Sequence, residues 1–273
     1  MTARLPFVKM HGAGNDFIMV DARCQPPGEL TAARIAALCD RRRGVGGDGL
    51  IVVSAVPDAD FAMRYFNADG REAAMCGNGA RCAVVFARRL GLVQRAQCEF
   101  RTASGLVSGR CEAGEVAVTL TPPGPVRLHV PVAGSPFAEH HFADTGVPHL
   151  VVPVPDVAGV ELPTWGPFLR RHAAFAPQGT NVDWVSPPLA PDGPWRLRTF
   201  ERGVEDETLA CGTGAAAAAL LLCRLGRATP PVALLTRGGD VLTLDVHDEQ
   251  GGTRLTLRGP AVVAFEGEAD WHD

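Results

Sequence analysis

The chain has 273 residues, of which 46% are hydrophobic and 21% are charged, and its formal net charge is −4. This length fits one large domain or two of about 135 residues each. The charge balance argues against nucleic-acid and membrane partners, because both favour basic patches. No apolar run approaches the ~18 residues that span a bilayer, and the first ten residues lack a signal region. We therefore expect a cytoplasmic protein.

Two residue counts limit the chemistry. Only Lys9 among the 26 basic residues is a lysine, and Met10 follows it, so a P-loop is excluded. Lys9 also lies in a strand-like opening without a phosphate-binding glycine loop, which argues against pyridoxal phosphate. The eight cysteines form no Cys-x-x-Cys motif and no zinc spacing. We expect free thiols, no metal and no cofactor.

The predicted elements indicate a mixed α/β fold. Alternating and β-branched runs predict strands at 15–20, 49–54, 97–103, 105–111, 115–120, 149–154, 181–186, 194–200, 231–236, 240–246 and 253–258. Tight turns between several of them imply antiparallel neighbours. Helices are predicted at 31–42, 78–90, 164–172 and 213–225, and the second and fourth are apolar nearly all round and end at Leu-Gly. This pattern predicts two domains, each a mainly antiparallel sheet or barrel wrapped around a central helix.

The chain also contains an internal repeat. Residues 76–91 (CGNGARCAVVFARRLG) and 211–226 (CGTGAAAAALLLCRLG) match at eight of sixteen positions and start 135 residues apart. The same offset pairs Asp48 with Asp183, which we interpret as turn residues. An offset of half the chain indicates two similar domains, 1–124 and 125–261, joined by a Pro- and Gly-rich segment. Residues 262–273 are expected to return to the first domain.

The repeat places Cys76 and Cys211 directly before its two helices. A helix N-terminus carries unpaired N–H groups and partial positive charge, so we expect a lowered thiol pKa at both positions. The glycines that follow let the backbone approach an anion closely. One thiolate base and one thiol acid suit removal of a proton α to a carboxylate and return of a proton to the other face. The other six cysteines are expected to be packing residues.

The same region resembles a known family. MHGAGNDF (10–17), FNADGREAAMCGNGARC (66–82), TGVPHLV (145–151), GTNVDWV (179–185) and FERGVEDETLACGTGA (200–215) resemble diaminopimelate epimerase. The resemblance implies two pseudo-symmetric α/β domains and a homodimer. It also implies conversion of LL-diaminopimelate to the meso form without pyridoxal phosphate or metal, in lysine and peptidoglycan precursor synthesis.

The resemblance also assigns roles to individual residues. It implies that Cys76 and Cys211 are the acid and base, and that His149 and Glu201 tune their pKa values. The residues that match substrate-binding positions are Asn15, Asn67, Gly77, Asn78, Asn181, Glu201, Arg202, Gly212 and Thr213. Val147 stands where the family often has a substrate-binding Asn, and Gly49 stands where some members have Gln, which affects recognition of the distal end of the substrate. A related amino-acid racemase and a non-catalytic amino-acid-binding protein remain as alternatives.

Overall fold

The computed structural model describes residues 3–23, 29–112 and 114–271, and the chain divides into two compact units. Unit 1 comprises residues 1–118 and 259–273, and unit 2 comprises residues 119–258. The sequence analysis set the limits at 1–124 and 125–261. Those domain limits stay a prediction.

Unit 1 is built on a mixed sheet. Its strands are β1 (Ala3–Gly12), β2 (Asn15–Asp21), β3 (Gly49–Ser54), β4 (Phe61–Asn67), β5 (Glu72–Ala73), β6 (Gln97–Thr102), β7 (Gly105–Glu112), β8 (Glu115–Thr119) and β18 (Val262–Trp271). They pair in the order β18-β1-β2-β3-β4-β6-β7-β8, with β5 also paired to β4. The β2–β3 and β4–β6 pairs are parallel, and the other pairs in this series are antiparallel.

Unit 2 repeats this topology. Its strands are β9 (Val126–Arg127), β10 (His141–Asp144), β11 (Pro148–Pro153), β12 (Asn181–Ser186), β13 (Trp195–Glu201), β14 (Asp206–Thr208), β15 (Val232–Leu235), β16 (Val241–Glu249) and β17 (Gly252–Gly259). They pair in the order β9-β10-β11-β12-β13-β15-β16-β17, with β14 paired to β13. The parallel pairs, β11–β12 and β13–β15, fall at the same steps as in unit 1. The repeat in the sequence is therefore also a repeat of strand order.

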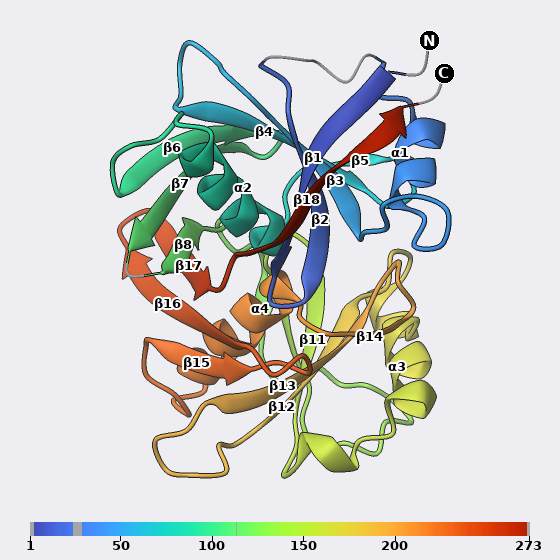
Figure 1. Ribbon diagram of the computed structural model, residues 1–273. Helices are drawn as coiled ribbons and strands as arrows, with labels where there is room; N and C mark the ends of the chain where they lie inside the picture. Colours follow the sequence, from blue (N-terminus) through green and yellow to red (C-terminus); the bar gives the residue numbers. More distant parts are fainter. Residues whose placement is uncertain (1–2, 24–28, 113, 272–273) are drawn as a thin grey trace. The chain divides into compact units, whose positions relative to one another are not determined.

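One long helix is buried in each unit. Unit 1 contains α1 (Ala32–Cys39) and α2 (Gly77–Arg89), and unit 2 contains α3 (Leu162–Arg170), α4 (Gly212–Arg224) and the 3-10 helices Val157–Gly159 and Ala173–Phe175. The α2 helix packs against β1, β2, β3, β4 and β7, and α4 packs against β10, β11, β12, β15 and β16 (Figure 1). This arrangement confirms the predicted fold class and explains why both helices are apolar nearly all round. Within the described ranges, no helix is long and apolar enough to cross a membrane.

The two buried helices end as the sequence predicts. Leu90 and Leu225 are their C-cap residues. Gly91 and Gly226 follow with φ values of +73° and +67°, in the left-handed region that glycine adopts without steric cost. The Leu-Gly pair is thus a local signal that fixes both helix ends.

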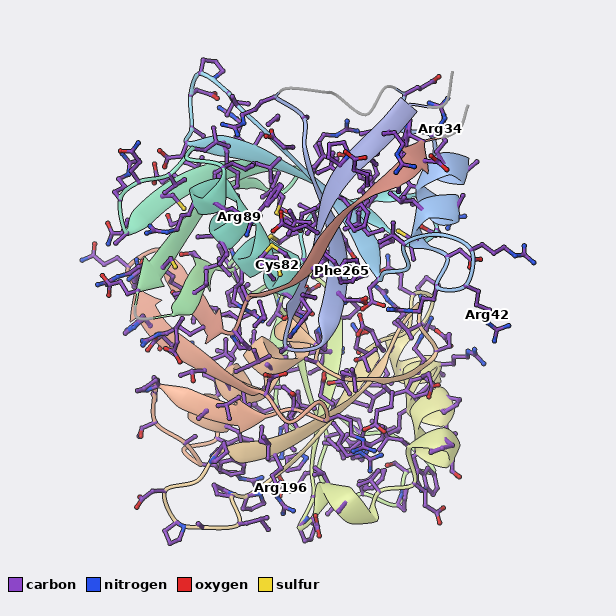
Figure 2. The ribbon with its side chains drawn as sticks, in the orientation of Figure 1. Arg34, Arg42, Cys82, Arg89, Arg196 and Phe265 are labelled. Carbon is purple, nitrogen blue, oxygen red and sulfur yellow. The ribbon has the colours of Figure 1, made fainter. Side chains whose placement is uncertain are left out.

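The returning strand β18 closes unit 1. It pairs antiparallel with β1, and Figure 1 shows the two strands side by side. Arg89, at the end of α2, forms an ion pair with Glu266 of β18. Phe265 of β18 packs edge-on against Phe7 of β1 with ring centroids 5.9 Å apart, and Figure 2 labels both Arg89 and Phe265. The sequence pattern alone predicts no strand over residues 262–271.

Candidate active site

Cys76 and Cys211 are the N-cap residues of α2 and α4. Each has extended backbone, and each sulfur accepts a hydrogen bond from the N–H group three residues later. The distances are 3.5 Å from Gly79 N to Cys76 Sγ and 3.4 Å from Gly214 N to Cys211 Sγ. Cys76 is partly exposed, whereas Cys211 is buried. The two sulfurs therefore occupy equivalent positions in the two units, as the repeat predicts.

The first turn of each helix offers further hydrogen-bond donors. The N–H groups of the first residues of a helix have no acceptor within the helix, and they lie at the positive end of its dipole. In α2 these are the groups of Gly77 and Asn78, and in α4 those of Gly212 and Thr213. Such groups bind anions, including carboxylates. Each cysteine therefore lies beside a potential carboxylate site.

Asn15 and Asn78 lie next to Cys76 in unit 1. Asn15 is the first residue of β2, and its Oδ1 lies 3.6 Å from Cys76 Sγ. The same oxygen accepts a hydrogen bond from Asn78 Nδ2 at 3.2 Å. Asn15 Nδ2 donates to Asp48 Oδ2 at 2.7 Å, and Arg41 Nη2 donates to Asp48 Oδ1 at 2.7 Å. The structure thus brings two of the predicted substrate-binding residues into contact with the predicted acid or base.

A fully buried arginine fixes the first turn of α2. Arg81 Nη2 donates to Asn78 Oδ1 at 2.9 Å, and its Nη1 donates to Gly77 O at 3.3 Å. Its Nε donates to Pro260 O at 3.2 Å, which joins the helix to the segment before β18. Neither the repeat nor the motifs single out Arg81. The signal for it is a charged residue near the start of a helix that is apolar nearly all round, where burial demands specific partners.

Asn67 and Gly49 lie opposite each other on β4 and β3. Asn67 is exposed, and its Oδ1 accepts a hydrogen bond from Tyr65 Oη at 2.8 Å. A Cβ atom at Gly49 would lie 2.3 Å from Phe66 O and 2.7 Å from Tyr65 Cε2. This backbone therefore leaves no room for the glutamine side chain that the resemblance gives to some family members at that position.

The surroundings of Cys211 in unit 2 form a chain of polar side chains. Thr213 Oγ1 lies 3.4 Å from Cys211 Sγ and 2.9 Å from His149 Nε2. His149 Nδ1 lies 2.7 Å from Asp183 Oδ2, and Thr199 Oγ1 donates to Asp183 Oδ1 at 2.7 Å. A carboxylate only accepts, so a neutral His149 carries its proton on Nδ1 and accepts from the Thr213 hydroxyl at Nε2. The side chains of His149 and Asp183 are completely buried.

The interpretation of Asp183 as a turn residue was wrong. Asp183 lies within β12, paired with Val151 of β11 and Thr199 of β13. A buried carboxylate inside a strand is tolerated because His149 and Thr199 satisfy its oxygens. Those partners lie 34 and 16 residues away in the chain. No local pattern in the sequence indicates them.

The expectation of a lowered pKa was also wrong for Cys211. Burial raises the pKa of the Cys211 thiol well above its ordinary value, and the charges of Glu201 and Asp183 raise it further. The hydrogen bonds from the Thr213 hydroxyl and Gly214 N–H act in the opposite direction without offsetting these effects. Removal from water therefore disfavours this thiolate more than the helix N-terminus stabilises it. Cys211 is a thiol at neutral pH in this environment.

Three of the other described cysteines are buried, as expected of packing residues, whereas Cys111 and Cys223 are partly exposed. Burial inside α2 raises the pKa of Cys82 to about 12, and Figure 2 labels this residue on the helix. Cys39 and Cys98 are also buried, and burial raises the pKa of each thiol to about 11. The cysteines of the described ranges are all free thiols, and Cys24 lies outside those ranges.

Asn181 holds the backbone that carries Glu201 and Arg202. Asn181 is the buried first residue of β12, and its Nδ2 donates to Pro148 O at 3.0 Å. Its Oδ1 accepts the backbone N–H of Arg202 at 2.8 Å. Arg202 is partly exposed, and its Nη1 lies 3.5 Å from Gln178 O. Both ends of the Asn181 amide are used by the backbone, so this residue positions the Glu201–Arg202 turn.

Lys9 is committed to an ion pair. Its buried Nζ lies 2.7 Å from Asp16 Oδ2 and also contacts Gly46 O. Burial raises the pKa of Asp16, but hydrogen bonds from Arg41 and Lys9 outweigh it and hold that pKa well below its usual range. A lysine that compensates a partly buried carboxylate is not available to form a Schiff base.

In the described part of the chain, one group of side chains has metal-ligand composition and spacing: His129, Glu139 and His141. His141 Nδ1 accepts the backbone N–H of His129 at 3.2 Å, and its Nε2 lies 3.2 Å from Glu139 Oε2. Arg227 donates to both Glu139 oxygens at 2.9 and 2.7 Å. Because Nδ1 uses its lone pair, a neutral His141 carries its proton on Nε2. These contacts describe a hydrogen-bond network rather than an open metal site.

Solved structures share this two-repeat fold. A phenazine biosynthesis protein of the PhzF family from Bacillus anthracis superposes with a TM-score of 0.76 at 17% identity, covering 97% of this chain and 99% of the other. A hydroxyproline epimerase from Agrobacterium vitis superposes with a TM-score of 0.71 at 18% identity, covering 99% of this chain and 93% of the other. The chain therefore has the two-unit α/β fold of these proteins, here with a cysteine capping the buried helix of each unit.

Sequence comparison identifies the family. The sequence model of the family described as diaminopimelate epimerase matches residues 7–125 and 141–263. Diaminopimelate epimerase from Gemmatimonas aurantiaca is 41% identical, covering 97% of this chain and 99% of that protein. Diaminopimelate epimerase from Aquifex aeolicus is 41% identical, covering 96% and 97%. The chain belongs to the diaminopimelate epimerase family, which is a family of isomerases.

Proposed function

We propose that this chain converts LL-2,6-diaminopimelate to meso-diaminopimelate, with Cys76 and Cys211 as the general acid and base. The observation that carries the proposal is the equivalence of the two cysteines. Each caps the buried helix of its unit, and each sulfur accepts a helix N–H group, at 3.5 and 3.4 Å. Full-length relatives that are 41% identical and named diaminopimelate epimerase support the assignment of substrate.

The reaction needs two groups with opposite protonation states. One sulfur removes the proton from the α-carbon, and the other delivers a proton to the opposite face of the same carbon. The carbanion formed between these steps delocalises its charge into the carboxylate. The first-turn N–H groups of Gly77, Asn78, Gly212 and Thr213 are donors that can stabilise this charge. The chemistry therefore uses residues of this chain alone, without pyridoxal phosphate or a metal.

The contacts of Cys211 suggest how this thiol becomes a base. Its proton can pass to Thr213, and from Thr213 to His149 Nε2, because Asp183 holds the proton of His149 on Nδ1. The charge of Glu201 raises the pKa of Cys211 in the free protein. We assign Glu201 to the substrate ammonium group. Binding of that cation would offset the Glu201 charge and make Cys211 easier to ionise.

The remaining assignments concern the distal end of the substrate and the location, oligomeric state and pathway of the enzyme. Arg202, placed by Asn181, is suited to bind the distal carboxylate through its guanidinium. Asn15 and Asn67 are assigned to the substrate as well. The proposal places the enzyme in the cytoplasm as a homodimer, in lysine and peptidoglycan precursor synthesis.

Incubation with LL-diaminopimelate in deuterated water tests the proposal. The protein is first dialysed against a chelator, and no pyridoxal phosphate is added. We expect meso-diaminopimelate that carries one deuterium at the inverted carbon. Parallel reactions with proline and glutamate test the racemase alternative, which requires faster exchange with one of those amino acids. Binding of diaminopimelate without any exchange at the α-carbon would instead identify a binding protein.

A further inference from the structure

We infer that Asp48 is a positioning residue for Cys76, because it fixes the Asn15 amide with its oxygen toward the sulfur. The inference rests on the proposed catalytic role of Cys76. It extends that proposal to a residue that the sequence analysis noted only as one of a repeated pair, Asp48 and Asp183. Three sets of contacts support it: those of Asp48, those of Arg81 and those around Cys211.

The first set of contacts orients Asn15. Asp48 Oδ2 accepts Asn15 Nδ2 at 2.7 Å and the Asp16 backbone N–H at 3.1 Å, while Asp48 Oδ1 accepts Arg41 Nη2 at 2.7 Å. The two ends of an amide have similar shapes, so hydrogen-bond partners decide its orientation. An ionised carboxylate accepts hydrogen bonds and cannot donate them. The NH2 group of Asn15 must therefore face Asp48, which turns Asn15 Oδ1 toward Cys76 Sγ at 3.6 Å.

The second set of contacts begins at Arg81 and requires the same orientation of the Asn15 amide. Arg81 donates hydrogen bonds and cannot accept them. Its Nη2 donates to Asn78 Oδ1 at 2.9 Å, so Asn78 Nδ2 must point away from Arg81. That nitrogen donates to Asn15 Oδ1 at 3.2 Å. Arg81 can only donate and Asp48 can only accept. Both residues therefore require that Asn78 Nδ2 points to Asn15 Oδ1 and that Asn15 Nδ2 points to Asp48.

The consequence concerns the proton on Cys76. Asn15 Oδ1 can accept the S–H group but would repel a thiolate, so Asp48 favours the thiol through Asn15. The N–H group of Gly79, which donates to the same sulfur at 3.5 Å, favours the thiolate. Asp48 therefore sets the balance between the two protonation states of Cys76 without contacting the sulfur.

The third set of contacts, around Cys211 in unit 2, has the same direction of hydrogen bonding: the cysteine donates. Asp183 holds the Nδ1 proton of His149, and His149 Nε2 then accepts from Thr213 Oγ1. Thr213 Oγ1 can then accept a hydrogen bond from the S–H group of Cys211, whose sulfur lies 3.4 Å away. In both units the repeated aspartate thus directs a polar group so that the cysteine is the hydrogen-bond donor. Two different sets of side chains give this one result.

Other charges near α2 are paired and do not compete with this assignment. The charged groups of the packed strands pair as follows: Arg4 with Glu268 and Asp270, Lys9 with Asp16, Asp21 with Arg23, Arg64 with Glu72, and Arg110 with Glu112. His11 of β1 accepts the Gly14 backbone N–H through Nδ1 at 3.4 Å. Among the described contacts, Asp48 accepts a direct hydrogen bond from Asn15, a side chain that contacts Cys76.

The test measures how the alkylation rate of Cys76 depends on pH. Wild-type protein, Asp48→Asn and Asp16→Asn react with iodoacetamide, and peptide mass analysis follows Cys76 alone. The amide introduced by Asp48→Asn can donate to Asn15, which permits the Asn15 amide to turn its nitrogen toward the sulfur. We expect Asp48→Asn to lower the apparent pKa of Cys76 by about one unit, a tenfold change in thiolate ratio. We also expect kcat to fall roughly tenfold.

Asp16→Asn is the matched control for charge. Asp16 contacts the same Arg41, at 2.6 Å, and its carboxyl group interacts with that of Asp48, but it makes no contact with Asn15 in the described network. We expect it to shift the apparent pKa of Cys76 by less than half as much. Equal shifts in the two variants, or no shift in Asp48→Asn, would overturn the inference.

A second variant covers the case in which Asp48→Asn does not fold. Asn15→Ala removes the accepting oxygen without changing any charge, and we expect the apparent pKa of Cys76 to fall. An unchanged alkylation profile in Asn15→Ala would also overturn the inference. These readouts follow thiol chemistry, so they are separate from failure of the proposed function. That failure would appear as normal epimerisation by Cys76→Ala.

Discussion

Replacing Asp183 by Asn tests how unit 2 controls its cysteine. The carboxylate binds His149 Nδ1 and Thr199 Oγ1, each at 2.7 Å, inside the protein. Asparagine keeps one accepting oxygen and presents an NH2 group in place of the other. If that NH2 group faces His149, the imidazole proton moves to Nε2 and points at Thr213, which reverses the hydrogen bonds that lead to Cys211. We therefore expect a loss in both stability and rate.

The magnitudes follow from the two contacts. A hydrogen bond to a charged group contributes roughly 1.5–3 kcal/mol, and Asp183→Asn loses about one of two such bonds. The free energy of unfolding should fall by about that amount, which corresponds to a Tm decrease of roughly 3–12 °C at 2–4 °C per kcal/mol. Incorrect placement of a catalytic imidazole proton costs roughly 10²–10⁴ in rate. We expect kcat to fall within that range and KM to change little.

Thr199→Val is the matched control. It removes the other partner of Asp183 and leaves the contact with His149 in place. We expect a similar loss of stability by urea denaturation, with kcat within about threefold of wild type. Epimerisation followed by chiral chromatography gives the rates. If Asp183→Asn retains wild-type kcat, or if Thr199→Val loses as much activity, the assignment of Asp183 to proton placement is refuted.

Three further predictions concern packing, pH and cofactors. Gly214→Ala should cost about 1–3 kcal/mol by urea denaturation, because its Cβ would lie 2.2 Å from Asp183 Oδ1. Gly79→Ala should cost less, because its Cβ would meet the flexible end of the Ile51 side chain at 2.8 Å, and equal costs would contradict this reasoning. Because burial raises the pKa of Cys211 above the ordinary 9.0, its alkylation rate in the free protein should keep rising above pH 9. A plateau below pH 9 would refute the raised pKa. Dialysis against a chelator without added pyridoxal phosphate should leave kcat unchanged, and a requirement for either cofactor would exclude the thiol mechanism.

The sequence predicts the two buried helices well because their signals are local. The Cys-Gly-x-Gly starts and Leu-Gly ends each involve a few consecutive residues, and both helices lie within one residue of the expected limits. Strand β4 (Phe61–Asn67) was missed although its residues alternate between buried and less buried positions. Strand β18 was missed because its identity depends on pairing with β1, at the other end of the sequence.

The site was harder to predict than the fold, for a physical reason. The helix-start motif places the cysteines, but the pKa of Cys211 depends on burial and on Glu201 and Asp183, which other strands bring close. Asp48 and Asp183 were visible as a repeat, yet their partners are set by parallel strand pairs between residues about 33 apart in the chain. Arg81 has no equivalent in unit 2, where Ala216 stands, so the repeat itself gave no indication of its role.

The most direct test of the central claim compares Cys76→Ala and Cys211→Ala with Cys82→Ala. All three changes remove one thiol, but Cys82 is a buried packing residue within α2. Each variant is first checked for a wild-type circular dichroism spectrum and then assayed with LL-diaminopimelate. We predict that Cys76→Ala and Cys211→Ala each lose roughly 10²–10⁴ or more in kcat for epimerisation, since each lacks the acid or the base. Cys82→Ala should retain turnover near the wild-type rate. Near-normal epimerisation by either Cys76→Ala or Cys211→Ala would contradict the two-cysteine mechanism.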